Sequence, residues 1–288
     1  MDLRRLGKTG YRIAPVAFGG IINTNEAQAD ADRYVACGVE RGVNYFDVAP
    51  TYGNAEERLG NALKPHRKNI FLACKTLRRD AAGSKEDLIQ SLKLLQTDYL
   101  DVYQMHAIKR DADVDKAFAS GGAMETLRRA KEEGVVRKLG ITAHSEECAL
   151  RCLELYDFDS VLYTMNWAHG MLRNDGAKLS AACAEKDVGL LCMKVLAYSR
   201  WRADETRPDP RLWYKPVELG SPLALAAMKY CLSRGAHALV PPGNFAAFSY
   251  MLDNVEEALA NPLSQADVDL LSAEAEKIKG MEIELINN

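Results

Sequence analysis

The sequence predicts an α/β fold, a (β/α)8 or TIM barrel, and three observations lead to it. Eight short apolar runs alternate with eight stretches of helical spacing along the chain, which is the pattern of βαβ units that build a parallel sheet. Glycines stand where several of the helices should end and the next strand begins. The 288 residues are enough for eight such units in one domain that spans 1–288.

The eight expected strands are apolar runs of four to seven residues. They lie at 14–18, 43–46, 70–74, 99–105, 136–141, 160–165, 188–193 and 237–241. Two long connections, 107–122 and 196–220, follow the fourth and the seventh run. Active sites of such barrels lie at the carboxyl ends of the strands, so we expect both connections to overhang the site.

Local signals set the expected helix boundaries. Spacing predicts a helix over 26–41, a Ser84-x-x-Asp87 capping pattern predicts one over 84–95, and Ser221 should cap a helix that begins at Pro222. Left-handed helix ends are expected at Gly42, Gly134, Gly189 and Gly235.

The first 13 residues precede the first βα unit. They hold two short alternating runs about a Lys-Thr-Gly turn, which predicts a small N-terminal β-hairpin. The alternative fold is a doubly wound sheet, which would place G-x-G-x-x-G after the first strand. The chain has GGIINTN there, and the barrel is therefore favoured.

Composition and charge restrict the partners. Apolar residues make up 48% of the chain and the formal net charge is −3, whereas a nucleic-acid binder normally has a basic excess. No signal peptide or membrane span is recognised, and seven cysteines fit reduced thiols better than a disulfide framework. We therefore expect a cytoplasmic protein that binds neither nucleic acid nor membrane, with its oligomeric state left open.

Four polar residues fall at what should be the active edge of the barrel. Asp47, Lys75 and His106 each follow an expected strand, and Tyr52 lies in a turn soon after Asp47. Singly, such a lysine is usually a solvated surface group and such a histidine a structural one. Together, an ammonium paired with a carboxylate favours the phenolate and lowers the pKa of the phenol, while an imidazole orients a carbonyl oxygen. The set can thus polarise and protonate a C=O bond.

Six stretches also match a known family in order and spacing. They are RRLGKTGYRIAPVAFGG, FDVAPTYGNAEERLG, IFLACKT, TDYLDVYQMH, VRKLGITAHS and VPPGN. In these the chain resembles the aldo-keto reductase superfamily. The resemblance implies an NAD(P)-dependent oxidoreductase acting between an alcohol and a carbonyl compound, either a sugar, an aldehyde or a ketone. It implies that Tyr52 is the general acid/base, Lys75 tunes it, Asp47 pairs with Lys75, and His106 positions the carbonyl.

The same resemblance implies cofactor contacts at the strand ends. Thr142 stands where the family has a serine that holds the nicotinamide amide, and Asn166 is expected to take over part of that role. Met193 stands where the family commonly has an aromatic ring that stacks on the nicotinamide. It begins a M-K-x-L motif at 193–196 that resembles a variant seen in bacterial members. The implied contacts are Gly20, Ile21, Asp47, Thr142, Asn166, Met193, Lys194, Val195, Leu196, Gly243, Asn244, Phe245 and Asn254.

The segment after the last strand bears on which cofactor is preferred. Family members that use NADP commonly clamp its 2′-phosphate there with cations, but no Lys or Arg lies between Arg234 and Lys277. We therefore predict that NAD(H) is used at least as well as NADP(H). An arginine of the 200–214 loop that reached across would weaken this reasoning.

The loop 198–219 has two interpretations. It is either a solvated surface loop or a lid whose Trp201 and Trp213 contact a sugar or aryl face, with arginines for an anion. Substrate contacts are accordingly expected at Tyr52, His106, Trp201 and Trp213.

No metal site is expected. His144, Cys148 and Cys152 recur at intervals of four, but Ser145 should cap the helix and leave His144 outside it. The two cysteines are then buried packing residues.

Two functions other than simple oxidation or reduction stay open. One is a non-catalytic barrel that senses bound cofactor. The presence of the complete tetrad of Asp47, Tyr52, Lys75 and His106 disfavours it. The other is a redox-neutral epimerase- or lyase-like enzyme that retains its NAD.

Overall fold

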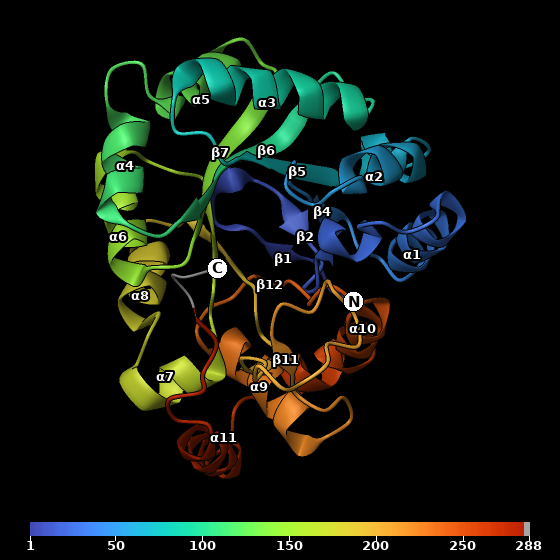
Figure 1. Cartoon of the computed structure of the whole chain (residues 1–288), viewed down its shortest axis with the longest axis vertical. Helices are drawn as coiled ribbons and strands as arrows, with labels where there is room; N and C mark the ends of the chain where they lie inside the picture. The colour runs from blue at the N-terminus through green and yellow to red at the C-terminus, as the bar shows by residue number, and fades with distance from the viewer. Residues whose placement is uncertain (285–288) are drawn as a thin grey trace.

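The structure, a computed structural model, describes residues 1–284, and they form a closed parallel barrel (Figure 1). The strand order is β12-β9-β8-β7-β6-β5-β4-β3. At the seam, Ala17 N donates to Leu239 O and Leu239 N donates to Pro15 O, both at 2.9 Å. These bonds close the sheet and confirm the (β/α)8 barrel. The strands are β3 (Phe18–Gly19), β4 (Tyr45–Asp47), β5 (Phe71–Thr76), β6 (Leu100–Ile108), β7 (Val136–Ala143), β8 (Ser160–Tyr163), β9 (Gly189–Cys192) and β12 (Ala238–Leu239).

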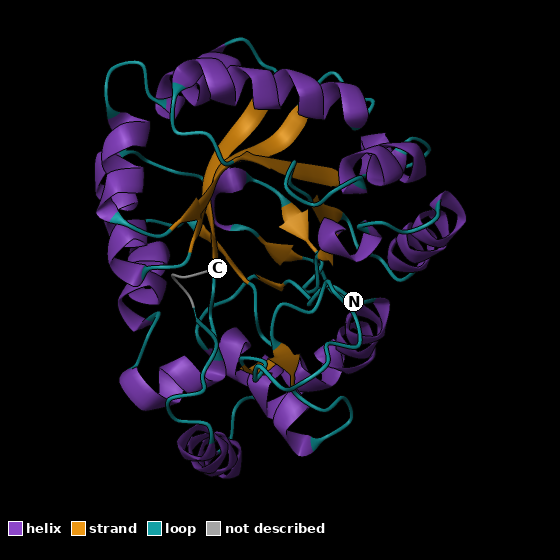
Figure 2. Ribbon diagram, viewed as in Figure 1, coloured by secondary structure: helices purple, strands orange, loops and turns teal. Residues whose placement is uncertain are grey.

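Helices surround the sheet as an outer layer (Figure 2). They are α1 (Gln28–Glu40), α2 (Ala55–Leu63), α3 (Ala81–Leu94), α4 (Asp111–Phe118), α5 (Ala123–Glu132), α6 (Glu146–Leu155), α7 (Trp167–Arg173), α8 (Ala177–Glu185), α9 (Pro222–Ser233), α10 (Phe245–Ala260) and α11 (Gln265–Lys277). α4 lies inside the connection 107–122, for which only a long loop is expected. No helix within residues 1–284 is long and apolar enough to span a bilayer.

The expected hairpin closes the N-terminal end of the barrel. β1 (Arg4–Arg5) pairs antiparallel with β2 (Arg12–Ile13), and the turn contains the 3₁₀ helix η1 (Gly7–Thr9). Leu6 points into the barrel core and has no exposed surface. Lys8 N also donates to Asp187 O at 2.6 Å, next to β9. Because the hairpin fills this end, the opposite end is the one open to ligands.

Two local predictions are wrong. α3 begins at Ala81, where the carboxylate of Asp80 accepts from Gly83 N at 2.7 Å. Ser84 lies inside that helix, and its hydroxyl donates to the carbonyl of Ala81. Gly189 is a β9 residue, and the left-handed position belongs to Asp187 (φ 51°).

Other boundary predictions are confirmed. Gly42, Gly134 and Gly235 have positive φ just after helices. Ser221 caps α9 by accepting from Ala224 N.

Candidate active site

Asp47 and Lys75 form a buried ion pair at the carboxyl ends of neighbouring strands. Asp47 ends β4 and lies opposite Ala73 of β5, so the parallel register brings the two side chains to one edge. Lys75 Nζ donates to Asp47 Oδ2 and, at 2.9 Å, to Val48 O. Lys75 is fully buried, and burial lowers its pKa. Asp47 and Tyr52 raise the pKa by more than burial lowers it, so the net direction is upward. The ammonium therefore stays charged.

Tyr52 lies beside this pair, in the turn before α2. Its ring centroid is 5.2 Å from Lys75 Nζ and 6.0 Å from the ring centroid of His106. Burial raises the pKa of Tyr52, Lys75 lowers it, and the net direction is upward. The predicted lowering by Lys75 is present, but the cost of burying a phenolate outweighs it. The phenol is protonated at neutral pH and is ready to donate a proton.

His106 presents a neutral imidazole at the same edge. Burial lowers its pKa far below the ordinary value, and cations such as Lys75 act in the same direction. Its Nδ1 is buried and has no hydrogen-bond partner within residues 1–284. Arg79 holds the backbone at this strand end, since its Nη2 donates to the carbonyls of His106 at 2.6 Å and Ala107 at 3.2 Å.

Gln104 is a site residue that the sequence reasoning missed. Its Nε2 donates to Asp47 Oδ1 at 2.8 Å, while Lys75 holds the other carboxylate oxygen. Side chains two apart on a strand point to the same side. Because Gln104 lies two residues before His106 on β6, that alternation could have identified it.

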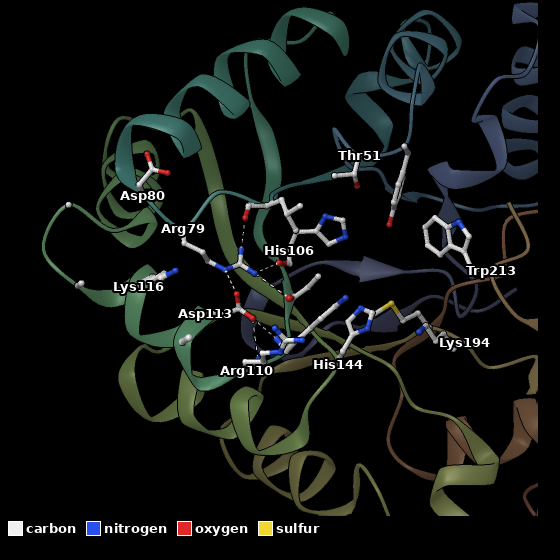
Figure 3. A pocket seen from close by; sticks show the side chains of 18 of the residues that line it. Thr51, Arg79, Asp80, His106, Arg110, Asp113, Lys116, His144, Lys194 and Trp213 are labelled. Atoms are coloured by element: carbon white, nitrogen blue, oxygen red, sulfur yellow. Dashed lines mark hydrogen bonds and ion pairs between the residues drawn. The ribbon is translucent and has the colours of Figure 1, made fainter. Parts of the chain in front are cut away.

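A cavity of about 1270 Å³ opens at this end of the barrel, with Tyr52 in its wall. His106 lies in the same wall (Figure 3). Residues of 107–122 and of 196–220 line it, as expected from the two long connections. The lining residues are Thr51, Tyr52, Leu77, Arg79, Asp80, His106, Ala107, Lys109, Arg110, Ala112, Asp113, Lys116, Ala119, Gly121, His144, Met193, Lys194, Arg207 and Trp213.

Of the residues implied for the nicotinamide end of a cofactor, Met193 and Lys194 line the cavity. Val195 and Leu196 have no exposed side chain and pack in the core. Thr142 is buried at the end of β7, and its Oγ1 accepts from Ala107 N at 2.7 Å.

Asn166 has no free amide atom. Its Oδ1 accepts from the backbone N–H groups of Ala168 and His169, and its Nδ2 donates to the carbonyls of Lys194 and Ala197. These four bonds use both hydrogens and both lone pairs. Asn166 therefore caps α7 and joins it to the segment after β9, and the implied nicotinamide contact has no free donor or acceptor here.

The segment after β3 packs against the end of β4. Gly20 and Ile21 belong to the 3₁₀ helix η2 (Gly20–Asn23), where a Cβ on Gly20 would lie 2.9 Å from the carbonyl oxygen of Asp47. The side chain of Asn23 is fully buried, and both its amide atoms lack a partner within residues 1–284. Unsatisfied buried polar groups are uncommon in proteins, so a partner such as a water, an ion or a ligand is expected at this amide. Sequence reasoning did not single out Asn23.

The residues after β12 lie under the 200–214 loop and not on the cavity. The carbonyl oxygen of Arg211 is 2.7 Å from where a Cβ on Gly243 would be. The Arg211 guanidinium bonds to Glu26 and donates to Ile22 O at 2.6 Å. The backbone of Arg211 therefore contacts Gly243, while its guanidinium lies at the segment after β3.

The other three residues implied after β12 are all engaged in local contacts. Asn244 caps α10. Phe245 stacks on Tyr34, with ring centroids 4.4 Å apart. Asn254 Nδ2 donates to a carbonyl one turn earlier at 2.7 Å.

The loop brings one of its two tryptophans to the site. Trp213 lines the cavity with its ring centroid 6.2 Å from that of Tyr52. Trp201 does not line it, because its indole nitrogen donates to Leu212 O at 2.9 Å and its ring lies under Lys215.

The His144 region forms a helix cap. Ser145 accepts from Cys148 N, which puts His144 outside α6 as predicted, and Cys148 and Cys152 are buried. Within residues 1–284, no group of three or more His, Cys, Asp or Glu side chains is arranged to hold a metal ion.

Sequence comparisons find relatives of this chain among the aldo/keto reductases. The sequence model of the aldo/keto reductase family matches residues 16–273. L-galactose dehydrogenase of Arabidopsis thaliana is 27% identical over 251 residues, which cover 82% of this chain and 76% of that protein. D-threo-aldose 1-dehydrogenase of a Pseudomonas species is 26% identical over 209 residues, which cover 61% of this chain and 62% of that protein.

A solved structure shows the same fold. The holo form of aldo-keto reductase AKR11C1 from Bacillus halodurans superposes with a TM-score of 0.73 at 23% identity, and the match covers 100% of both chains.

Proposed function

The chain belongs to the aldo/keto reductase family, a family of oxidoreductases, and from this premise we propose that it interconverts a small carbonyl compound and its alcohol with a nicotinamide cofactor. The observation that carries the proposal is the grouping of a protonated Tyr52, the Lys75–Asp47 ion pair and a neutral His106 around one cavity.

The proposed chemistry divides between cofactor and protein. A reduced nicotinamide, when bound, would supply the hydride that the carbonyl carbon accepts and would itself be oxidised. Tyr52 donates its phenolic proton to the carbonyl oxygen, so the C=O double bond becomes a C–O single bond with one new C–H and one new O–H. Lys75 stabilises the phenolate left on Tyr52, and Asp47 keeps Lys75 charged and in place. His106 is available to hydrogen-bond the carbonyl oxygen.

The residues present fit a nicotinamide at this site. The cavity beside Tyr52 is walled on one side by Met193, whose thioether can pack against a flat ring. Asn23 offers an unsatisfied buried amide at the end of β3, and Gly20 allows a close backbone approach. We propose that these residues hold the cofactor, and that Gly243, Asn244, Phe245 and Asn254 serve its far end once the 200–214 loop moves.

The test is oxidation of NADH and NADPH by the purified protein with a panel of sugars, aldehydes and ketones, alongside Tyr52→Phe. We expect the variant to lose turnover by about 10²–10⁴-fold, the typical contribution of a general acid, with cofactor affinity nearly intact. Tyr156→Phe is the matched control, because that tyrosine packs on Phe158 away from the cavity.

Each outcome has a definite meaning. Wild-type kcat in Tyr52→Phe would contradict the role of the tetrad. Cofactor binding without turnover of any substrate would instead favour a sensing barrel, and NAD that remains bound and is recycled would favour an epimerase- or lyase-like enzyme.

A further inference from the structure

The cavity wall carries an excess of positive charge although the chain as a whole is acidic. Six of its residues are Lys or Arg and two are Asp, whereas the formal net charge of the chain is −3. Figure 3 shows Arg79, Arg110, Lys116 and Lys194 around the same opening as His106. The charge of the cavity is therefore a local property and does not reflect overall composition.

The two acidic residues offset only part of this charge. Asp113 forms an ion pair with Arg79 at 3.4 Å, and it also accepts from the backbone N–H groups of Lys109 and Arg110 at 3.1 Å. Asp80 caps α3. Within residues 1–284, no carboxylate pairs with five of the cavity cations, which are Lys109, Arg110, Lys116, Lys194 and Arg207.

These five cations lie at two depths. Lys194 is 7% exposed and Lys109 is half-buried, so these two lysines lie deeper than the other three cations. Burial and the charge of Lys109 lower the pKa of Lys194 to about 8. Arg110, Lys116 and Arg207 are exposed at the rim. Cations that repel each other in a cavity gain most from a ligand that carries a compensating charge.

We propose, on the premise of the oxidoreductase function above, that the substrate of this cavity is an anionic carbonyl compound or alcohol whose carboxylate or phosphate is bound by Lys109 and Lys194. The rim cations attract the anion toward the opening. Tyr52 and His106 lie in the wall of the same cavity, so a small molecule held by its charged end has its reactive carbon within reach of the proton donor.

The position of the cations argues that they serve substrate and not cofactor phosphates. Lys109, Arg110 and Lys116 follow β6, whereas the residues proposed for the far end of the cofactor follow β12. In the parallel order, β12 and β6 are separated by β9, β8 and β7. These three cations thus lie away from β12. Lys194 follows β9, the neighbour of β12, and it is assigned to the substrate anion because the charge of Lys109 acts on it.

The test compares matched aldehydes with the wild-type protein and NADH. The carboxylate arm is 4-carboxybenzaldehyde against benzaldehyde, and the phosphate arm is D-glyceraldehyde 3-phosphate against D-glyceraldehyde. We expect the anionic member of at least one pair to have a higher kcat/KM by about 10- to 100-fold, mostly through KM, since hydrogen bonds to charged groups have that strength. The arm with the larger ratio identifies the anion.

Variants assign the effect to residues. Lys109→Met and Lys194→Met should each lower kcat/KM for the anionic aldehyde about tenfold more than for its neutral partner, and Lys109→Arg should restore it. Lys178→Met, an exposed lysine on α8, is the matched control and should change neither value. Calorimetric titration with the unreactive pair 4-carboxybenzamide and benzamide measures binding without turnover and should show the same preference.

Three results would overturn the proposal. They are equal kcat/KM within both pairs, equal losses for both members in the Met variants, and Met variants that weaken NADH binding as much as they weaken 4-carboxybenzamide binding. If none of the tested substrates leads to oxidation of NADH, the oxidoreductase proposal fails. The calorimetric comparison then still decides whether the cavity binds anions.

Discussion

Lys75 is a charged group with no exposed surface, and its partner Asp47 is almost as buried. We predict that Lys75→Met abolishes turnover and also lowers the free energy of unfolding by about 3–5 kcal/mol, because it leaves an uncompensated buried carboxylate. Urea unfolding measures the second effect. The double variant Lys75→Met/Asp47→Asn removes both charges and keeps a partner for Gln104. It should regain most of the stability and none of the activity.

If Lys75→Met behaved like a surface substitution in both assays, the ion pair would have no role. If the double variant regained turnover, Lys75 would act only through the stability of the site.

The protonation states of Tyr52 and His106 predict a pH profile. Burial raises the pKa of Tyr52, so the proton donor for reduction persists through the neutral range and is lost only at alkaline pH. Oxidation needs the phenolate, and its rate should rise as the pH rises. His106 has a strongly lowered pKa and stays neutral. We expect kcat/KM for reduction of a neutral aldehyde to be flat between about pH 6 and pH 9, because Lys194, with its pKa of about 8, acts only on anionic substrates. A break near the ordinary histidine pKa would contradict this assignment.

At the residue scale, the sequence predicts which chemical groups form the site better than it predicts how buried or hydrogen-bonded each group is. The types and strand-end positions of Asp47, Lys75 and His106 follow from the pattern, because a parallel barrel collects strand ends at one rim. The net pKa direction of Tyr52 depends on how deeply the phenol is buried. The engagement of all four amide positions of Asn166 depends on segments far apart along the chain. Neither quantity is present in a local pattern.

At the scale of elements, the N-terminal hairpin gives a matched pair of glycines. Gly7 and Gly10 both have positive φ, but a Cβ on Gly7 would lie 2.4 Å from Gly189 N, while nothing is within 4 Å of one on Gly10. We predict that Gly10→Ala costs about 1–2 kcal/mol of unfolding free energy from backbone strain alone. Gly7→Ala should cost about 1–3 kcal/mol more, because it also forces the hairpin away from β9.

Urea unfolding of the two variants measures this difference. Equal losses would show that the hairpin is not held against the barrel floor.

Element boundaries were predictable to different degrees. The alternation of apolar runs and helical spacing identified all eight barrel strands, since burial on both faces requires such runs. Their lengths were not predictable, as β12 shows. It has two ladder residues where a five-residue run was expected, because a ladder needs hydrogen-bonding neighbours and not only apolar side chains. For α3, Asp80 and Ser84 are both good caps, and only the three-dimensional path of the chain selects Asp80.

At the scale of the whole molecule, cations from distant segments gather near the start of α10. The sequence shows no Lys or Arg in this segment, but the backbone and Cβ of Arg211 pack against Gly243 while its guanidinium bonds to Ile22 and Glu26. The Arg33 guanidinium lies 5.9 Å from the ring centroid of Phe245. Arg41 pairs with Asp253 on α10 itself at 2.7 Å. A count of the charged residues within one segment therefore underestimates the positive charge that other segments place beside it in the folded chain.

These cations are nevertheless already paired, and this decides the last prediction. Arg33 pairs with Asp30 at 2.7 Å, and Arg211 pairs with Asp209 and Glu26. A 2′-phosphate with close to two negative charges would have to displace these carboxylates to gain a clamp. We therefore expect NAD(H) to be used at least as well as NADP(H), measured as kcat/KM for both cofactors at fixed ionic strength, because salt screens phosphate contacts. Arg33→Ala and Arg211→Ala should leave the ratio unchanged. A strong preference for NADPH that either variant abolished would show that the guanidinium exchanges its carboxylate for the phosphate when the cofactor binds.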